Sequence, residues 1–571
     1  MGPRHPELAQ PLTRLSDLLI EAHRYQDAAQ VDLRLAHLER ARFGSLWPAS
    51  DVEISTELWG RSLAYQNVCV NHLLITEGQL LLFPRQSCLA GLWLLTSARI
   101  EAVRRSIVDG SRQLASLEAR LALREGLRDD ALSMLHIADT YLSTAPPDSP
   151  AVLAAALEFV AFLHQDPVAE AMESFAARLA GDETKPAPGE DEQVLSAAMI
   201  QNSLPPDTAA LAYLLGPDRS YLMIIGRGSI ALEPLMFQLP SLRRRVDELR
   251  ADLDPSSWQR GAAPTSIKTV LALSLYQDLL LPAMPHIRDC RQLVLIPDGA
   301  LRKLPFSALV TTPSVAALWS HHDAWTPAWL GVRYAIATLP SLGALVASSH
   351  TSPSSASKAF LGLGAPSLPG RAHGTSPPTA SELRRGNPRL ADAIRRLDPL
   401  PAASSELRQL AELAGTNASD GLTGAAFTRR RIHAEPLRNY RVMAFSTHGL
   451  SANRTDSSSE AALILTPPMV ASADEDGLLT ATDVAALRLD AVLVILSTCQ
   501  SAAPSAGRED DFLTGLARSF FEAGSRAVLV TRWPMPDASA DVTVRFLRHA
   551  VDSPSQSLAE ALKSAVIEAT T

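Results

Sequence analysis

Short apolar runs recur through the C-terminal two-thirds of the chain, and they constrain its fold more than any other feature. The run at 492–496, Val-Leu-Val-Ile-Leu, shows the pattern most clearly. A strand that is apolar at every position is typical of a sheet covered on both faces, and helical patterns lie between the runs. The sequence therefore predicts an α/β domain with a central, mostly parallel sheet. The runs lie at residues 211–215, 221–225, 293–296, 335–339, 360–363, 442–445, 491–496 and 527–530.

The first 180 residues carry a different pattern, in which apolar side chains recur at helical spacing. Leu35 and Leu38 fall on one helical face, and the segments 129–142 and 151–164 are typical of a helical hairpin. We predict an all-α domain at 1–180. Stacked hairpins indicate tetratricopeptide-type (TPR-like) repeats, but an irregular helical bundle explains the pattern as well, so both interpretations stay open.

A polar segment with two prolines and two glycines separates these two regions at 181–192. Such composition is typical of a linker, which we place at 181–204. The α/β domain then covers 205–571, with a first half at 205–350 and a second half at 358–571. Two or more domains are what a chain of 571 residues is expected to form.

Charge and cysteine content narrow the class of protein. The net charge of −9 gives no reason to expect nucleic acid or an anionic membrane as a partner. The four cysteines lack CxxC spacing, which argues against a disulfide framework or zinc ribbon and favours a reducing compartment. The sequence shows no secretory signal and no apolar stretch long enough to span a bilayer. We therefore expect a cytoplasmic protein, with no metal and no other cofactor.

Two predicted strands in the second half end in residues that can perform chemistry. The segment 441–449 runs into His448 and Gly449, and the segment 492–499 runs into Cys499. Ligands of open α/β sheets sit outside the carboxyl ends of the strands. Neighbouring parallel strands would therefore bring this imidazole and this thiol together at one edge of the sheet.

An imidazole beside a thiol supports nucleophilic catalysis. The histidine takes the proton of Cys499 and later protonates a departing amine. The backbone N–H groups of Gly449 and Cys499 are the natural donors to a developing oxyanion, because glycine allows close approach of the backbone. The alternative reading is that Cys499 is an inert core thiol and His448 a strand-end residue satisfied by hydrogen bonds.

Further motifs stand in an order that resembles a known family. They are Pro-Asp-Gly at 297–299 with Leu-Pro-Phe at 304–306, Leu-Gly-Leu-Gly-Ala-Pro at 361–366, Ser-Thr-His-Gly at 446–449, Asp-Gly-Leu-Leu-Thr at 476–480, Ser-Thr-Cys at 497–499 and Trp-Pro at 533–534. From about residue 205 onward the chain resembles a CHAT domain, the caspase-like module related to separase and often fused to tetratricopeptide repeats. The interval of about 50 residues between His448 and Cys499 is also similar to that of caspases.

The resemblance implies a caspase-like α/β fold, a pseudo-caspase-like first half and a His448/Cys499 dyad in the second half. The chain departs from the family at Ser446, where alanine is common, and after Cys499, where Gln500 replaces an acidic residue. The first change leaves the dyad intact, and the second puts the substrate preference in doubt. The predicted substrate-binding residues are Asp511, Asp537 and Trp533.

A carboxylate from Asp511 or Asp537 would favour an arginine or lysine before the scissile bond. Both aspartates also precede helical patterns, where aspartate is a common N-cap. The sequence thus predicts a cysteine endopeptidase that cleaves a specific protein, after a basic residue. The helical domain would bind a regulatory protein and gate the enzyme. The family implies a setting in bacterial defence or regulated cell death.

Two other functions stay open from the sequence. One is a non-catalytic scaffold that keeps the caspase-like fold, and the other is a small-molecule thiol hydrolase. The substrate protein, the activating signal and the oligomeric state are not encoded in any visible motif.

Overall fold

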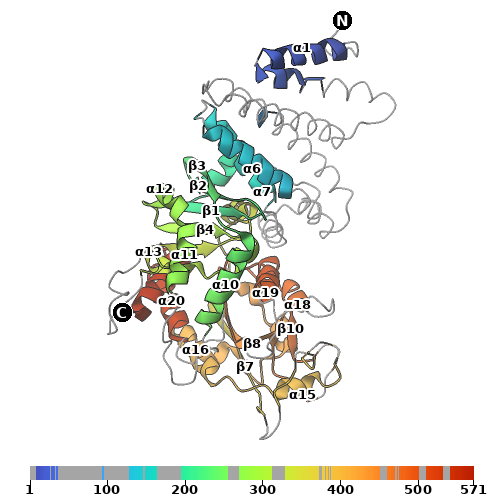
Figure 1. Ribbon diagram of the computed structural model, residues 1–571. Coiled ribbons are helices and arrows are strands. Elements are labelled where there is room, and N and C mark those ends of the chain that lie inside the picture. The colour runs from blue at the N-terminus through green and yellow to red at the C-terminus, as the bar shows by residue number, and fades with distance from the viewer. Residues whose placement is uncertain are drawn as a thin grey trace. The chain divides into compact units, whose positions relative to one another are not determined.

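The structure is a computed structural model that describes part of the chain. The described residues are 8–22, 24–25, 27–32, 34–35, 93–94, 128–143, 145, 148–163, 195–254, 269–311, 328–371, 376–379, 381–383, 385, 387–450, 460–469, 472, 475–499, 510–531 and 540–570. The chain divides into two compact units (Figure 1). The first comprises residues 1–165, 185–203 and 211–239, and the second comprises 166–184, 204–210 and 240–571.

The first unit contains helices and a β-hairpin. Its elements are α1 (Ala9–Glu21), α6 (Arg128–Leu142), α7 (Ser149–Leu163), α9 (Ala197–Asn202), β2 (Ser220–Gly226) and β3 (Ser229–Leu235), and β1 (Thr208–Leu214) begins in the second unit and ends in the first. The predicted hairpin at 129–142 and 151–164 corresponds to α6 and α7, which pack together. The short helix α9 falls within the predicted linker. It forms there because Ser196 caps its N-terminus and Ile200 is buried.

The second unit alternates helices and strands, as the apolar runs predict. Its first elements are α10 (Leu239–Leu253), α11 (Thr269–Leu279), α12 (Met284–Ile287), β4 (Gln292–Ile296), α13 (Leu330–Arg333), β5 (Ala335–Thr338) and α14 (Leu342–His350). Its later elements are β6 (Lys358–Pro366), α15 (Leu390–Arg395), α16 (Pro401–Leu413), β7 (Leu422–Gly424), α17 (Arg429–Ala434), β8 (Tyr440–Leu450), β9 (Ala462–Ile464), β10 (Leu478–Thr480), α18 (Ala481–Ala485), β11 (Leu493–Cys499), α19 (Asp510–Ala523), β12 (Val528–Val530), α20 (Ala540–Asp552) and α21 (Leu558–Thr570). In the described part of the chain, no helix is both long enough and apolar enough to cross a membrane.

A seven-stranded sheet organises the later elements. Five of its strands, in the order β7-β6-β8-β11-β12, run parallel, which agrees with the predicted sheet. The strands β9 and β10 extend the sheet with antiparallel pairing beyond the end of β6. Strand β8 therefore lies inside the sheet, between β11 on one side and β6 followed by β9 on the other.

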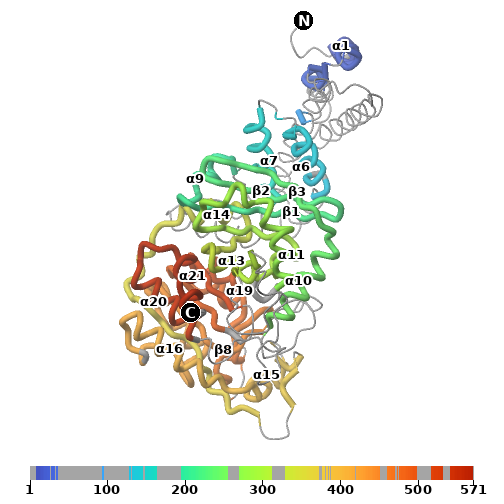
Figure 2. The backbone as a smooth tube through the Cα atoms, turned by 60° about the vertical axis from the view of Figure 1, so that its left-hand side comes forward, coloured from blue at the N-terminus to red at the C-terminus, as the bar shows by residue number. Residues whose placement is uncertain are grey.

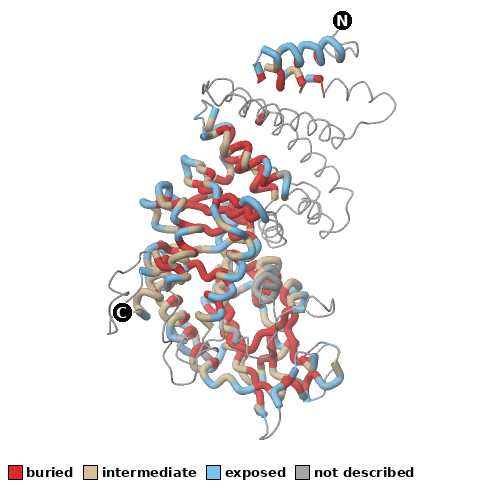
Figure 3. The backbone as a smooth tube through the Cα atoms, viewed as in Figure 1, coloured by how far each residue is buried: buried red, intermediate tan, exposed pale blue. Residues whose placement is uncertain are grey.

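Helices cover both faces of this sheet. One face packs against α16, α20 and α21, and the other packs against α18 and α19 (Figures 1 and 2). The side chains of β8 alternate between these layers: Ala444 belongs to the first cluster, whereas Met443 and Phe445 belong to the second. The buried residues accordingly follow the strands, and the exposed residues lie on the outer helices and loops (Figure 3).

Gly364 lets β6 approach β8 at the edge of the candidate site. Its φ is +150°, and a Cβ built there would lie 2.1 Å from the backbone oxygen of Ser446. A side chain at this position would therefore push the two strands apart.

We expect Gly364→Ala to lower the free energy of unfolding by about 2 to 3 kcal/mol, because the added methyl group meets rigid backbone. Chemical denaturation measures the change. Gly362→Ala is the matched control on the same strand, since a Cβ there meets only side-chain atoms, at 3.4 Å or more. Equal losses for the two variants would contradict the close-approach argument.

Candidate functional site

The strands β8 and β11 bring the two predicted catalytic residues side by side. Their parallel register pairs Leu493 with Val442 and continues residue by residue to Cys499, which pairs with His448. The sequence argument needed these strands to be neighbours, parallel and in step, and the backbone meets all three conditions. The side chain of Cys499 lies outside the described part of the chain.

The face of the sheet on which this pair falls follows from the alternation of residues. Ala444, Leu493 and Ile495 pack in the cluster formed with α16 and α20. Ser446 and Ser497, a register pair two residues before the dyad, reach the same layer, since both bond to a side chain of α16. Period-two alternation continues this face to positions 448 and 499.

The imidazole of His448 is fixed by a backbone carbonyl. Its Nε2 lies 2.8 Å from the carbonyl oxygen of Asp398, and the residue is 2% exposed. Because a carbonyl only accepts, Nε2 carries the proton and Nδ1 carries the lone pair in the neutral ring. Burial lowers the pKa of His448, although the Asp398 carbonyl and carboxylate oppose this effect. Burial therefore favours the neutral ring, in the tautomer that has its proton on Nε2 and its lone pair on Nδ1.

The carbonyl that orients His448 belongs to a restrained turn. Asp398 precedes Pro399, and Pro401 occupies the first turn of α16, where its fixed φ suits a helix start. The Asp398 carboxylate pairs with Arg371 through two hydrogen bonds of 3.1 Å each. The hydrogen-bond acceptor for Nε2 of His448 is thus a backbone carbonyl, and its position depends on the residues around it.

Glu406 is a further polar residue of the site that the sequence reasoning missed. Its carboxylate accepts hydrogen bonds from Ser446 and Ser497, each at 2.7 Å, and so bridges β8 and β11 directly before the dyad. The residue is 6% exposed, and burial raises its pKa, while the two hydroxyl donors oppose the rise. The repeated tripeptides Ser-Thr-His and Ser-Thr-Cys were the available signal for a shared partner.

The structure describes the remaining predicted site residues only in part. Gly449 is buried in β8 and pairs in register with Leu463 of β9, because the strand continues past His448 to Leu450. Asp511 lies in the first turn of α19, but its side chain is outside the described set. Trp533 and Asp537 both fall outside the described residues.

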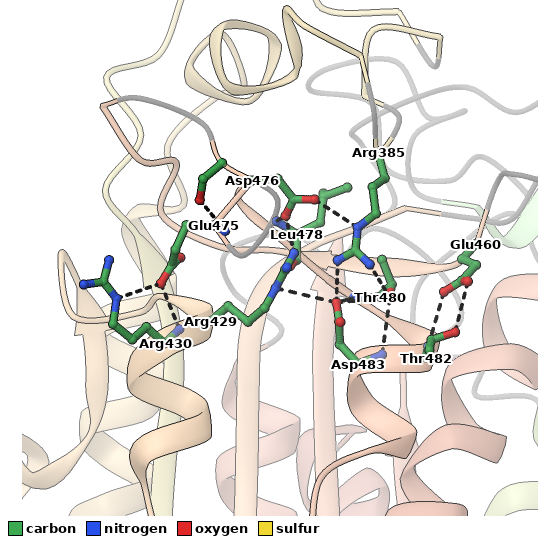
Figure 4. Close-up of polar contacts among 11 residues, drawn as sticks. Arg385, Arg429, Arg430, Glu460, Glu475, Asp476, Leu478, Thr480, Thr482 and Asp483 are labelled. Atoms are coloured by element: carbon green, nitrogen blue, oxygen red, sulfur yellow. Dashed lines mark hydrogen bonds and ion pairs between the residues drawn. The ribbon is translucent and has the colours of Figure 1, made fainter.

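A network of charges holds the strands that extend the sheet beyond β8 (Figure 4). Arg429, at the start of α17, donates to the carbonyl of Leu478 at 2.6 Å and to the carboxylate of Asp476. Arg385 bridges Asp476 and Asp483 at 2.9 and 2.6 Å. The two arginines and two aspartates therefore fix β10, and through β9 they support the end of β8.

Groups that could act elsewhere are few in the described part of the chain. No set of three His, Cys, Asp or Glu residues there is arranged to hold a metal ion. Cys290 is a free, partly buried thiol, and burial raises its pKa, with smaller contributions from Asp207 and Asp289. Its thiol is accordingly less reactive than an ordinary cysteine.

Comparison with known proteins places the second unit in a family. The CHAT domain matches residues 269–571. Tetratricopeptide repeat protein 28 of Homo sapiens is 26% identical over 286 residues, which cover 44% of this chain and 10% of the relative. Tetratricopeptide repeat protein 28 of Mus musculus is 29% identical over 309 residues, which cover 48% of this chain and 11% of the relative. The chain thus spans about a tenth of the length of these relatives. Since the family match takes in more than half of the 571 residues, the chain belongs to the CHAT domain family.

Proposed function

We propose that this protein is a caspase-like cysteine endopeptidase whose nucleophile is Cys499 and whose general base is His448. The observation that carries the proposal is the register pairing of the two residues on adjacent parallel strands, beside an imidazole already fixed by Asp398. A buried neutral imidazole and a thiol at neighbouring positions form the pair that acyl transfer requires.

In the proposed reaction His448 first takes a proton, as a base, and then gives it back, as an acid. Nδ1 of His448 takes the proton from the Cys499 thiol, and the sulfur attacks the carbonyl carbon of the scissile peptide bond. The imidazolium returns its proton to the departing amine as the carbon–nitrogen bond breaks. Water then hydrolyses the thioester with the same histidine as base, while the N–H groups of Gly449 and Cys499 are the proposed donors to the oxyanion.

For the substrate we propose a protein cut after an arginine or lysine. Support comes from the sequence positions of Asp511, in the first turn of α19, and of Asp537, which follows β12. A carboxylate in a shielded pocket favours a guanidinium or ammonium group. Trp533 is proposed as a substrate contact on the same segment as Asp537.

We also propose that the N-terminal helices bind a regulatory protein. The hairpin of α6 and α7 and the names of the two relatives support a TPR-like arrangement, and stacked helices of that kind form extended binding surfaces. The setting in bacterial defence or cell death stays a prediction.

A non-catalytic scaffold is the second candidate, and the deep burial of His448 favours it. In that case the histidine and its bond to Asp398 would serve packing alone. The two functions differ in one property, which is the reactivity of the Cys499 thiol in the folded protein.

We expect an irreversible peptidyl electrophile to label Cys499 in the native chain, and a peptide ending in arginine to label it at least about tenfold faster than one ending in glutamate. The labelling rate should fall on the acid side with a midpoint below pH 6.5, because burial lowers the pKa of His448 and the base is lost only when its ring is protonated. Mass spectrometry of the labelled peptides over a pH series measures both effects.

Cys290 provides an internal control, because its raised pKa predicts slow labelling with no preference among peptides. His448→Ala should reduce the labelling of Cys499 to the level of Cys290. Labelling of Cys499 no faster than that of Cys290 would favour the scaffold and contradict the peptidase. Labelling without preference for the basic peptide would contradict the substrate proposal alone.

A further inference from the structure

Glu406 places a buried carboxylate under the dyad. It lies on α16, and its two oxygens accept one hydroxyl from β8 and one from β11, at 2.7 Å each. Ser446 and Ser497 are register partners, and the next pair on the same face is His448 and Cys499. Two residues along a strand span about 7 Å, so the two serines that bind the carboxylate lie about 7 Å along their strands before positions 448 and 499.

Burial removes most of the water around Glu406, which is 6% exposed. Phe360 of β6, Ala444 of β8, Leu493 of β11 and Phe546 of α20 form the apolar cluster against which α16 packs. Burial of this kind strengthens every electrostatic interaction, because the local dielectric constant is low. Other charges near the pair come from Asp398, which faces His448, and from Arg371, which binds the Asp398 carboxylate.

The same short stretch of chain also supplies the acceptor for the imidazole. Asp398 and Glu406 stand at either side of the start of α16, at Pro401. One bonds the ring of His448 and the other bonds the two strands that carry the dyad. Helix α16 and the residues directly before it therefore supply both the contact to the base and the contact to the two strands.

We propose that Glu406 is a positioning residue that holds β8 and β11 in register and whose negative charge stabilises the imidazolium of His448. The inference rests on the proposed peptidase, because it concerns the proton that moves from the Cys499 sulfur to Nδ1 of the imidazole. In that transfer the S–H bond breaks and an N–H bond forms. The carboxylate takes no proton and touches no substrate.

The contact with Glu406 gives Ser446 a structural role. An alanine at this position would leave one oxygen of Glu406 without its donor. An unsatisfied buried carboxylate is costly, so Ser446 and Glu406 form a matched pair in this chain.

The test is the rate at which iodoacetamide alkylates Cys499 over a pH series in the full chain. Glu406→Gln keeps the shape of the side chain and removes its charge, and it replaces one accepting oxygen with an N–H donor, so that one of the two serines must accept a hydrogen bond instead of donating one. Loss of a nearby negative charge makes the deprotonation of both His448 and Cys499 easier. In the plot of alkylation rate against pH, the midpoints of both titrations should therefore move to lower pH, by roughly one unit. Ser446→Ala and Ser497→Ala keep the charge but each remove one bond, and they should lower the rate severalfold with a smaller shift.

Glu412→Gln is the matched control, since Glu412 lies on the same helix, is exposed and makes no described side-chain bond to either strand. It should reproduce the wild-type profile. A wild-type profile for Glu406→Gln as well, with Cys499 still reactive, would overturn the role of Glu406 and leave the peptidase standing. Wild-type Cys499 that reacts no faster than Cys290 would overturn the peptidase and this inference with it.

Discussion

Cleavage of the protein substrate is expected to fall at least about a thousandfold when Cys499 is replaced by alanine, and by a similar factor for His448→Ala. Without the sulfur no thioester forms, and without the imidazole the thiol keeps its proton and the amine leaves unprotonated. Because the two groups act as one unit, the double variant should be no slower than either single variant. Capture of new protein N-termini after incubation with a lysate measures the loss.

The control for this experiment is the thermal stability of the Cys499→Ala variant. Cys499 ends β11, where alanine keeps the backbone register with β8, so Cys499→Ala should unfold within a few degrees of the wild type. Cys290→Ala, which alters a thiol with no proposed role, should cleave normally. Undiminished cleavage by a folded Cys499→Ala variant would end the assignment, whatever the identity of the substrate.

The pairing of the dyad could be predicted because it depends on local patterns. The runs at 442–445 and 492–496 are apolar at every position, which is typical of strands that are covered on both faces of a sheet. These two runs form β8 and β11, in which His448 and Cys499 are register partners. Strand length was harder to predict: β8 continues to Leu450 because β9, which follows it, adds antiparallel pairing.

The residues that support the dyad could not be predicted from such patterns. Asp398 lies 50 positions before His448, and its carbonyl acts through the backbone, so its side chain gives no signal. Glu406 lies in an amphipathic helix, where a glutamate usually faces water, and only the packing of α16 on the sheet turns it inward. Asp511, Trp533 and Asp537 stay predictions.

The largest expected effect on stability comes from Arg429. Its side chain is 9% exposed and is bonded to the carbonyl of Leu478 and to the carboxylate of Asp476, which is itself buried (Figure 4). Among the described residues, Arg429→Ala would leave that carboxylate with Arg385 as its remaining cation. Breaking a buried pair from one side costs about 3 to 5 kcal/mol, and we expect a loss of that size in chemical denaturation.

The neighbouring residue supplies the control. Arg430 is 82% exposed, and its pair with Glu475 spans 3.4 Å, so Arg430→Ala should cost less than about 1 kcal/mol. The two substitutions remove the same side chain from adjacent positions of α17. A loss of equal size from both would show that the helix, and not the buried charge, is what the alanine disturbs.

Acid should weaken the network in a defined range. Burial alone would raise the pKa of Asp483, but the N–H of Thr480 and the guanidinium groups of Arg385 and Arg429 hold it below its usual 3.8. This stabilisation is therefore complete well above pH 3.8 and is lost as the pH falls through the lower folded-state value.

Because β10 and β9 continue the sheet from the end of β8, Arg429→Ala should also slow the alkylation of Cys499. Normal alkylation in a destabilised Arg429→Ala variant would show that the network supports the fold without reaching the dyad.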